Sequence, residues 1–181
     1  MAYLTYDDGP NPTWTPQVLE VLERHDVPAT FFVVGEWAKR YPQLVQQTRG
    51  AGHVVTNHSY THPELWDLGD AEIRTELNRT NDVIGETRCY RPPYGAVTQR
   101  VDAAAGEAGS QWSVLWNAGG NDWQRPGAKA IADKIVHEMT PGGIALMHDG
   151  GGDRSQTVAA TEDIISRLKA KGYTFEALPM C

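Results

Sequence analysis

The chain has 181 residues, 40% of them hydrophobic, and a formal net charge of -7 at pH 7. This length and apolar content predict one domain over residues 1–181 with a sizeable core. The acidic balance argues against nucleic acid or an anionic membrane surface as a partner, because both attract a basic face. No apolar run approaches the length of a membrane span, so we expect no membrane partner.

Short apolar runs alternate with longer amphipathic segments along the whole chain. Period-2 runs rich in β-branched and aromatic residues predict strands at residues 2–6, 29–34, 54–57, 89–91, 113–116, 144–147 and 173–176. Helical spacing of apolar residues predicts helices at residues 15–25, 36–49 with a break at Pro42, 73–84, 97–108, 128–139 and 157–171. We expect Asp70 to cap the third of these helices and Gly85 to end it.

This alternation predicts a parallel β/α array. A complete eight-unit barrel typically needs about 250 residues, so an incomplete or distorted barrel fits this chain better.

Polar side chains follow the predicted strands at their carboxyl ends. They are Asp7, Asp8, His58, His62, Arg91, Asp122 and His148. Because the carboxyl ends of strands in a parallel barrel share one face, and that face carries the active site, we expect these residues to converge there.

His58 and His62 lie four residues apart and predict a metal site. Two imidazoles and a third ligand brought by the fold, for which we take Asp8, can hold one divalent transition metal and leave positions open. Pro63 disfavours a helix at His62, so we place both histidines on a tight turn after a strand. Taken alone, the pair could equally be two exposed loop histidines.

The remaining polar residues predict hydrolysis of an acyl bond with a separate base and acid. Asp7, beside the metal ligand, would take a proton from water, and Arg91 would favour its ionised form. His148 would protonate the leaving group, with Asp122 orienting its imidazole.

Most of the tryptophans are expected to have structural positions, and the other histidines are expected to have no catalytic role. We expect Trp14, Trp37, Trp112 and Trp116 in the core or in helix packing. Trp123 is expected to form a wall of the site, and Trp66 is left open between a site contact and a loop residue. His25, His53 and His137 receive no role.

Five ordered segments resemble the motifs of the polysaccharide deacetylase family, carbohydrate esterase family 4. They are Thr-Tyr-Asp-Asp-Gly-Pro at 5–10, His-Ser-Tyr-Thr-His at 58–62, Arg-Pro-Pro-Tyr-Gly at 91–95, Asp-Trp at 122–123 and Leu-Met-His-Asp at 146–149. Tyr6 stands where phenylalanine is usual. Gly119 stands where members often carry an acidic residue, which predicts a more flexible loop there.

The resemblance implies a distorted (β/α)7 barrel and a divalent metal, usually Zn²⁺, which Co²⁺ or Ni²⁺ can replace. Asp8, His58 and His62 correspond to the metal ligands.

By the same resemblance, Asp7 is the catalytic base, Arg91 its partner, His148 the acid and Asp122 the residue that tunes it. A second set completes the site: Tyr94 offers a backbone N–H to the oxyanion, and Trp123 and Leu146 line the acetyl pocket.

The activity so predicted is removal of acetyl groups from N-acetylglucosamine glycans, namely chitin oligomers, chitosan or peptidoglycan, with acetylated xylan as a further candidate. An acetylxylan esterase, a hydrolase of small cyclic amides and a non-catalytic glycan-binding module are the alternatives. The expected partner is an acetylated polysaccharide or oligosaccharide, bound by a monomer.

Cys89 and Cys181 either form a disulfide that pins the C-terminus or remain two free thiols. A disulfide would indicate export, because such bonds persist mainly in oxidising compartments. We therefore expect an extracellular or cell-wall location, with any targeting segment preceding this sequence. Residues 150–154 predict a mobile loop at the mouth of the site.

Overall fold

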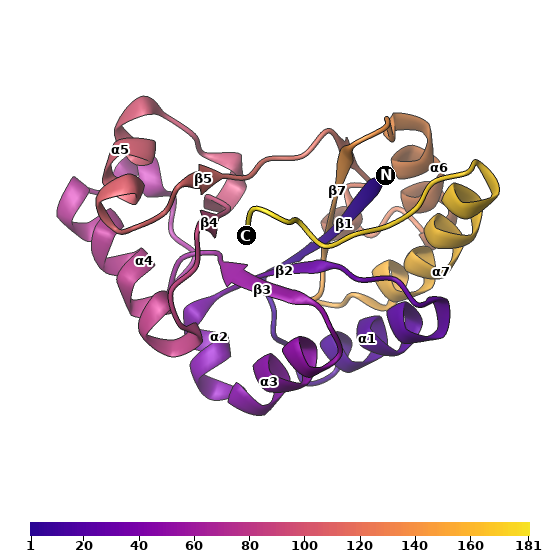
Figure 1. Ribbon diagram of the computed structural model, residues 1–181, viewed down its shortest axis with the longest axis horizontal. Coiled ribbons are helices and arrows are strands. Elements are labelled where there is room, and N and C mark those ends of the chain that lie inside the picture. Colours follow the sequence, from indigo (N-terminus) through magenta and orange to yellow (C-terminus); the bar gives the residue numbers. More distant parts are fainter.

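The computed structural model describes residues 1–181. Its centre is one curled sheet of seven parallel strands in the order β5-β4-β3-β2-β1-β7-β6 (Figure 1). The strands are β1 Ala2–Asp7, β2 Thr30–Val33, β3 Val54–Asn57, β4 Cys89–Tyr90, β5 Trp112–Ser113, β6 Ala118–Gly119 and β7 Gly143–His148. Strands β5 and β6 stand at the two edges and do not pair with each other. The predicted distorted (β/α)7 barrel is therefore confirmed, with one open side.

Helices flank the outside of the curled sheet (Figure 1). They are α1 Trp14–His25, α2 Gly35–Arg40, α3 Pro42–Gly50, α4 Asp70–Ile84, α5 Gln99–Glu107, α6 Ala128–Glu138 and α7 Ser155–Ala170. The break at Pro42 is confirmed, because α3 begins there. The predicted cap at Asp70 is wrong by one residue: the N-cap is Gly69, whose N–H donates to Glu72 Oε2 at 2.8 Å.

Two strand predictions are corrected by the structure. Residues 173–176 form only an isolated parallel bridge between Phe175 and Ala2, so they pair with the start of β1 at a single position and are not a strand of the sheet. The sequence pattern missed β6, which completes the set of seven strands and consists of only two residues of low strand propensity. Gly119 belongs to β6 and pairs with Leu146, so the flexible loop expected at this position is wrong.

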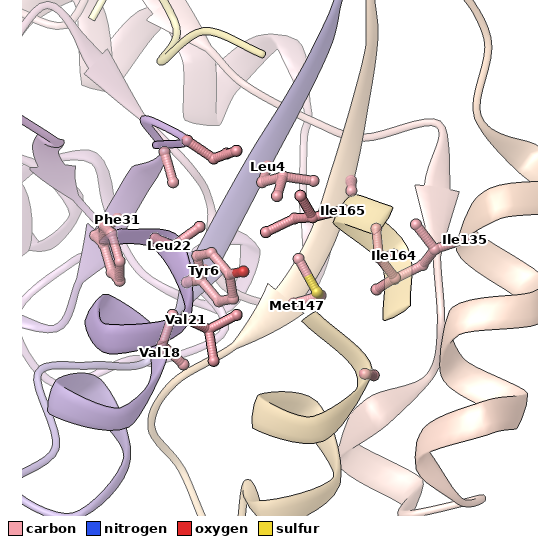
Figure 2. Packing of buried hydrophobic residues seen from close by; sticks show 14 of the residues in the cluster. Leu4, Tyr6, Val18, Val21, Leu22, Phe31, Ile135, Met147, Ile164 and Ile165 are labelled. Atoms are coloured by element: carbon pink, nitrogen blue, oxygen red, sulfur yellow. The ribbon is translucent and has the colours of Figure 1, made fainter. Parts of the chain in front are cut away.

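The main core lies between the sheet and the helices. In the register of the sheet, Tyr6 of β1 sits beside Phe31 of β2 and Met147 of β7. Figure 2 shows these side chains packed against Val18 of α1 and Ile164 of α7, among others. Each such buried aliphatic or aromatic side chain contributes about 1.5–3 kcal/mol through removal from water.

A smaller apolar cluster fills the inside of the barrel below the site. It comprises Phe32, Cys89, Val114 and Leu178, with Tyr3, Ile144 and Cys181 packed against them. Figure 1 shows the C-terminal segment crossing the sheet from α7 towards β4. Leu178 N–H donates to Thr30 Oγ1 at 2.9 Å, and Cys181 forms a disulfide with Cys89. The C-terminal segment thus covers the amino-terminal end of the barrel. The polar residues lie at the opposite end, where the strands finish.

None of the helices combines the length and the apolar character that crossing a membrane requires.

Substituting Cys181→Ser should lower the free energy of unfolding by about 2–4 kcal/mol, because the disulfide closes a long loop in the unfolded chain. The two cysteines are 92 positions apart. Denaturant unfolding of the oxidised protein, the reduced protein and the variant measures the loss. A reductant should destabilise the parent and leave Cys181→Ser unchanged; equal stability of all three would contradict the bridge.

Candidate active site

A cavity of about 490 Å³ opens where the carboxyl ends of the strands meet. Its lining residues are Asp7, Asp8, His58, His62, Pro92, Tyr94, Gly95, Trp116, Trp123, Leu146 and His148. Eight of the ten residues predicted for the site are among them. The other two, Arg91 and Asp122, are buried directly behind it. The structure therefore brings the whole predicted set together.

Asp8, His58 and His62 form a compact cluster of possible metal ligands. Asp8 Oδ1 lies 3.4 Å from His58 Nε2 and 3.2 Å from His62 Nε2. The predicted tight turn is confirmed: Ser59 and His62 both adopt left-handed φ angles, 64° and 61°, and His62 N–H donates to Ser59 Oγ at 3.1 Å. The turn brings the two imidazole rings together, with centroids 4.9 Å apart.

This cluster fits a divalent cation. His58 Nδ1 donates to the carbonyl of Arg91 at 2.7 Å, which leaves the Nε2 lone pair directed at Asp8. Asp8 Oδ1 is buried and accepts no hydrogen bond. A cation between these donor atoms would satisfy both, and two imidazoles with one carboxylate suit zinc and neighbouring transition metals.

Asp8 is also suited to act as an anionic ligand. Burial would raise the pKa of its carboxyl group, but the neighbouring imidazoles of His58 and His62 outweigh burial and hold this pKa far below its usual range. The carboxylate is therefore ionised at neutral pH.

Asp7 is held beside this cluster by a buried arginine. Arg91 is 0% exposed, and its Nη1 donates to Asp7 Oδ1 and to Thr5 Oγ1, both at 2.7 Å. Its Nε donates to the carbonyl of Val114 at 3.0 Å. The other carboxylate oxygen of Asp7, Oδ2, faces the cavity and lies 3.7 Å from His58 Nε2. The pairing places the guanidinium against one oxygen of the buried Asp7 side chain and leaves the other oxygen free of it.

His148 lines the cavity and is paired with the buried Asp122. Its Nδ1 donates to Asp122 Oδ1 at 2.7 Å, while Asp122 Oδ2 accepts from Thr157 Oγ1 at 2.7 Å and from the His148 amide at 2.9 Å. Burial would lower the pKa of His148, but the hydrogen bond to Asp122 and the charges of Asp122 and Asp8 raise it above the ordinary value. Thr157, which the sequence analysis missed, fixes the Asp122 carboxylate.

Tyr94 presents its backbone to the cavity in a left-handed conformation, with φ 60° and ψ 10°. Its amide hydrogen finds no acceptor within the chain. Its ring lies edge-on to His62, with centroids 4.8 Å apart. A free N–H at this position can donate to an oxyanion that forms in the cavity.

Tryptophans form the apolar wall of the cavity. Trp123 lines it as predicted and is 58% exposed. Trp116 was expected in the core, and this is wrong: it is 37% exposed and lines the cavity, and a Cβ atom added to Gly95 would lie 3.0 Å from its ring. Trp112 is likewise exposed instead of buried, because β5 is an open edge of the sheet. Trp116 is the last residue of the predicted strand 113–116, and this position at the carboxyl end of a strand is the signal that would have placed it at the site. Trp66 lies outside the cavity.

Residues 150–154 pack closely against Asp8. A Cβ atom added to Gly150 would lie on the Asp8 carbonyl, and one added to Gly151 would approach Asp8 Oδ2 to 2.5 Å. Arg154 is buried, donates to the carbonyl of Gly150 and lies 4.0 Å from Asp8 Oδ2. The glycines are needed because the backbone of this loop supports the carboxylate.

Comparison with known proteins agrees with this geometry. The sequence profile named polysaccharide deacetylase matches residues 1–112. A chitooligosaccharide deacetylase from Sinorhizobium fredii is 40% identical over 194 residues, which cover 98% of this chain and 90% of the relative. A solved peptidoglycan N-acetylglucosamine deacetylase superposes with a TM-score of 0.91 at 34% identity, covering 98% of this chain and 86% of that one.

A further solved relative is described as a family 4 pseudoenzyme from Bacillus anthracis. It superposes with a TM-score of 0.91 at 32% identity, covering 98% of this chain and 63% of that one. Overall similarity therefore shows kinship, whereas activity depends on the residues of the site. The chain belongs to the polysaccharide deacetylase family.

Proposed function

We propose that this protein is a metal-dependent hydrolase that removes acetyl groups from N-acetylglucosamine-containing glycans, such as chitin oligomers or peptidoglycan. One observation carries the proposal: an arginine-paired carboxylate, Asp7, and an aspartate-paired imidazole, His148, line one cavity together with three candidate metal ligands. The deacetylases named among the relatives support the substrate class.

Asp8, His58 and His62 would hold the metal. The bound metal ion would polarise the acetyl carbonyl and make a water molecule more acidic. Zn²⁺ is the ion we propose, on the chemistry of the donor set.

Asp7 then accepts the proton of the attacking water at Oδ2, the oxygen that Arg91 leaves free. As the acetyl carbon becomes tetrahedral, the amide N–H of Tyr94 donates to its oxygen, a contribution of about 3 kcal/mol to the barrier in comparable sites. His148, held through Nδ1 by Asp122, gives its Nε2 proton to the departing sugar nitrogen. Acetate and the free amine are released.

The presence of both base and acid argues against the glycan-binding module, since binding alone requires neither. An acid matters most for amides, because an unprotonated amine leaves poorly. The His148–Asp122 pair therefore favours amide cleavage over the acetylxylan esterase alternative. We also propose export of the protein, which the Cys89–Cys181 disulfide supports.

Mass spectrometry of chitin oligomers after incubation with the protein tests the proposal directly. Metal-stripped protein should leave the oligomers intact, and added Zn²⁺ or Co²⁺ should restore successive losses of acetyl groups. Asp7→Asn should lower the rate by about 10²–10⁴-fold while the metal remains bound. Intact oligomers with release of acetate from acetylated xylan would instead identify an esterase.

Gly151→Ala should weaken zinc binding about tenfold or more, because the new methyl group would displace the Asp8 carboxylate. Gly152→Ala is the matched control, since it also has a positive φ, 149°, but its Cβ would meet only Arg154 at 3.9 Å. Competition with a chromophoric chelator measures both affinities. Equal losses in the two variants would mean that backbone strain, and not contact with Asp8, is responsible.

Asp122→Asn should shift the alkaline limb of the kcat profile to lower pH. The raised pKa of His148 depends on the charge of Asp122, so without this charge burial would lower the pKa and the acid would lose its proton earlier. Asp163→Asn, which removes the same charge from the surface of α7, serves as control. An unmoved limb in Asp122→Asn would exclude His148 as the titrating acid.

A further inference from the structure

A second cavity, of about 460 Å³, adjoins the active-site cavity at Asp8, which lines both. Its walls come from segments that follow three neighbouring strands, β1, β2 and β7. The other lining residues are Pro10, Asn11, Pro12, Thr13, Trp37, Arg40, Tyr41, Gly151 and Gly152. Only Gly151, which packs against Asp8, has a part in the proposed hydrolysis, so the reaction itself leaves the rest of this cavity unexplained.

Two aromatic rings and an arginine form one wall of this cavity. Trp37 and Tyr41 stack with centroids 6.5 Å apart and an interplanar angle of 17°. The guanidinium carbon of Arg40 lies 5.8 Å from the Trp37 ring and 5.6 Å from the Tyr41 ring. Arg40 is exposed and makes no ion pair or side-chain hydrogen bond within the chain, which leaves its N–H groups free for a ligand. Trp37 was expected in packing alone; it is half-buried and also faces this cavity.

The opposite wall is held in place by hydrogen bonds. Asn11 Oδ1 accepts from the amides of Thr13 at 2.8 Å and Trp14 at 3.1 Å, and Asn11 N–H donates to Thr15 Oγ1 at 2.7 Å. Val34 N–H donates to the carbonyl of Gly9 at 2.9 Å, which ties the segment after β2 to the segment after β1. A cavity held in this way needs little ordering when a ligand enters.

We propose that this second cavity binds a sugar residue adjacent to the one that loses its acetyl group, on the Trp37 side of Asp8. A pyranose ring has an apolar C–H face and a rim of hydroxyl and acetamido oxygens. The C–H face suits the rings of Trp37 and Tyr41, and the rim oxygens suit the free donors of Arg40. A cavity of this size falls in the usual range of small-molecule sites. The inference rests on the proposed function, because it assumes that a glycan occupies the neighbouring cavity.

The dependence of kcat/KM on chain length tests the inference. With chitin oligomers of two to six sugars, kcat/KM of the parent should rise once the chain reaches the second cavity. Arg40→Ala and Trp37→Ala should each remove a gain of about fivefold on long oligomers and leave the shortest oligomer unaffected. Trp37→Phe should restore most of the gain. Trp66→Ala is the matched control, because Trp66 is exposed but lines neither cavity.

A purely structural role for Trp37 and Arg40 predicts a different result. The variants would then lose activity equally at every chain length, together with a lower Tm, and the proposal would be overturned. Because the Arg40 side chain is exposed, we expect Arg40→Ala to fold normally, so a loss of activity in this variant would not be caused by misfolding. No dependence on chain length in the parent would also overturn it.

A failure of the proposed function can be recognised separately. If the parent deacetylates no oligomer, calorimetric titration of the zinc-loaded protein with the same oligomers still reports on the cavity. Affinity that increases with chain length and is lost in Arg40→Ala would support the second cavity as a sugar site. Affinity that is absent or independent of length would refute it.

Discussion

The buried ion pair between Arg91 and Asp7 is the interaction on which the site depends. Arg91 donates to Asp7 and Thr5 through one nitrogen and to the carbonyl of Val114 through another, while its own carbonyl accepts from His58. It therefore joins the base, a candidate metal ligand and the segment that spans the open side of the barrel. Breaking such a pair from one side typically costs about 3–5 kcal/mol, because a charge remains buried without a partner.

Negative charge at the site is distributed among distinct partners. Asp7 is paired with Arg91, Asp8 faces two imidazoles, and Asp122 faces His148. Asp149 is different: burial, together with the charges of Asp8 and Asp7, raises its pKa to about 7, despite a hydrogen bond from Thr15. A carboxyl group that is partly protonated near neutral pH limits repulsion in a place where several carboxylates meet, and it packs against Gly9, which has no room for a side chain.

Much of the fold and site could be predicted because parallel strands impose simple geometry. Hydrophobic periodicity located six of the seven strands, and the carboxyl ends of such strands must share one face. The polar residues at the carboxyl ends of β1, β3 and β7 were therefore expected together. The errors arose where periodicity carries little information: β6 is a two-residue strand, and residues 173–176 are strand-like in composition but form a single bridge to β1. Trp116 was misplaced because the open edge exposes a segment that a closed barrel would bury.

The sequence by itself determined which chemistry is available: carboxylates, imidazoles and an arginine placed just after strands, whose reactivity depends on residue type and order. Only the tertiary structure decided how they are used. It set which oxygen of Asp7 is free, which nitrogen of His58 faces Asp8, and how Thr157 holds Asp122. It also brought Trp37 and Gly151, far apart in the chain, to one cavity. These features depend on how the sheet curls and where its two edges stop, and no local pattern of residues encodes that.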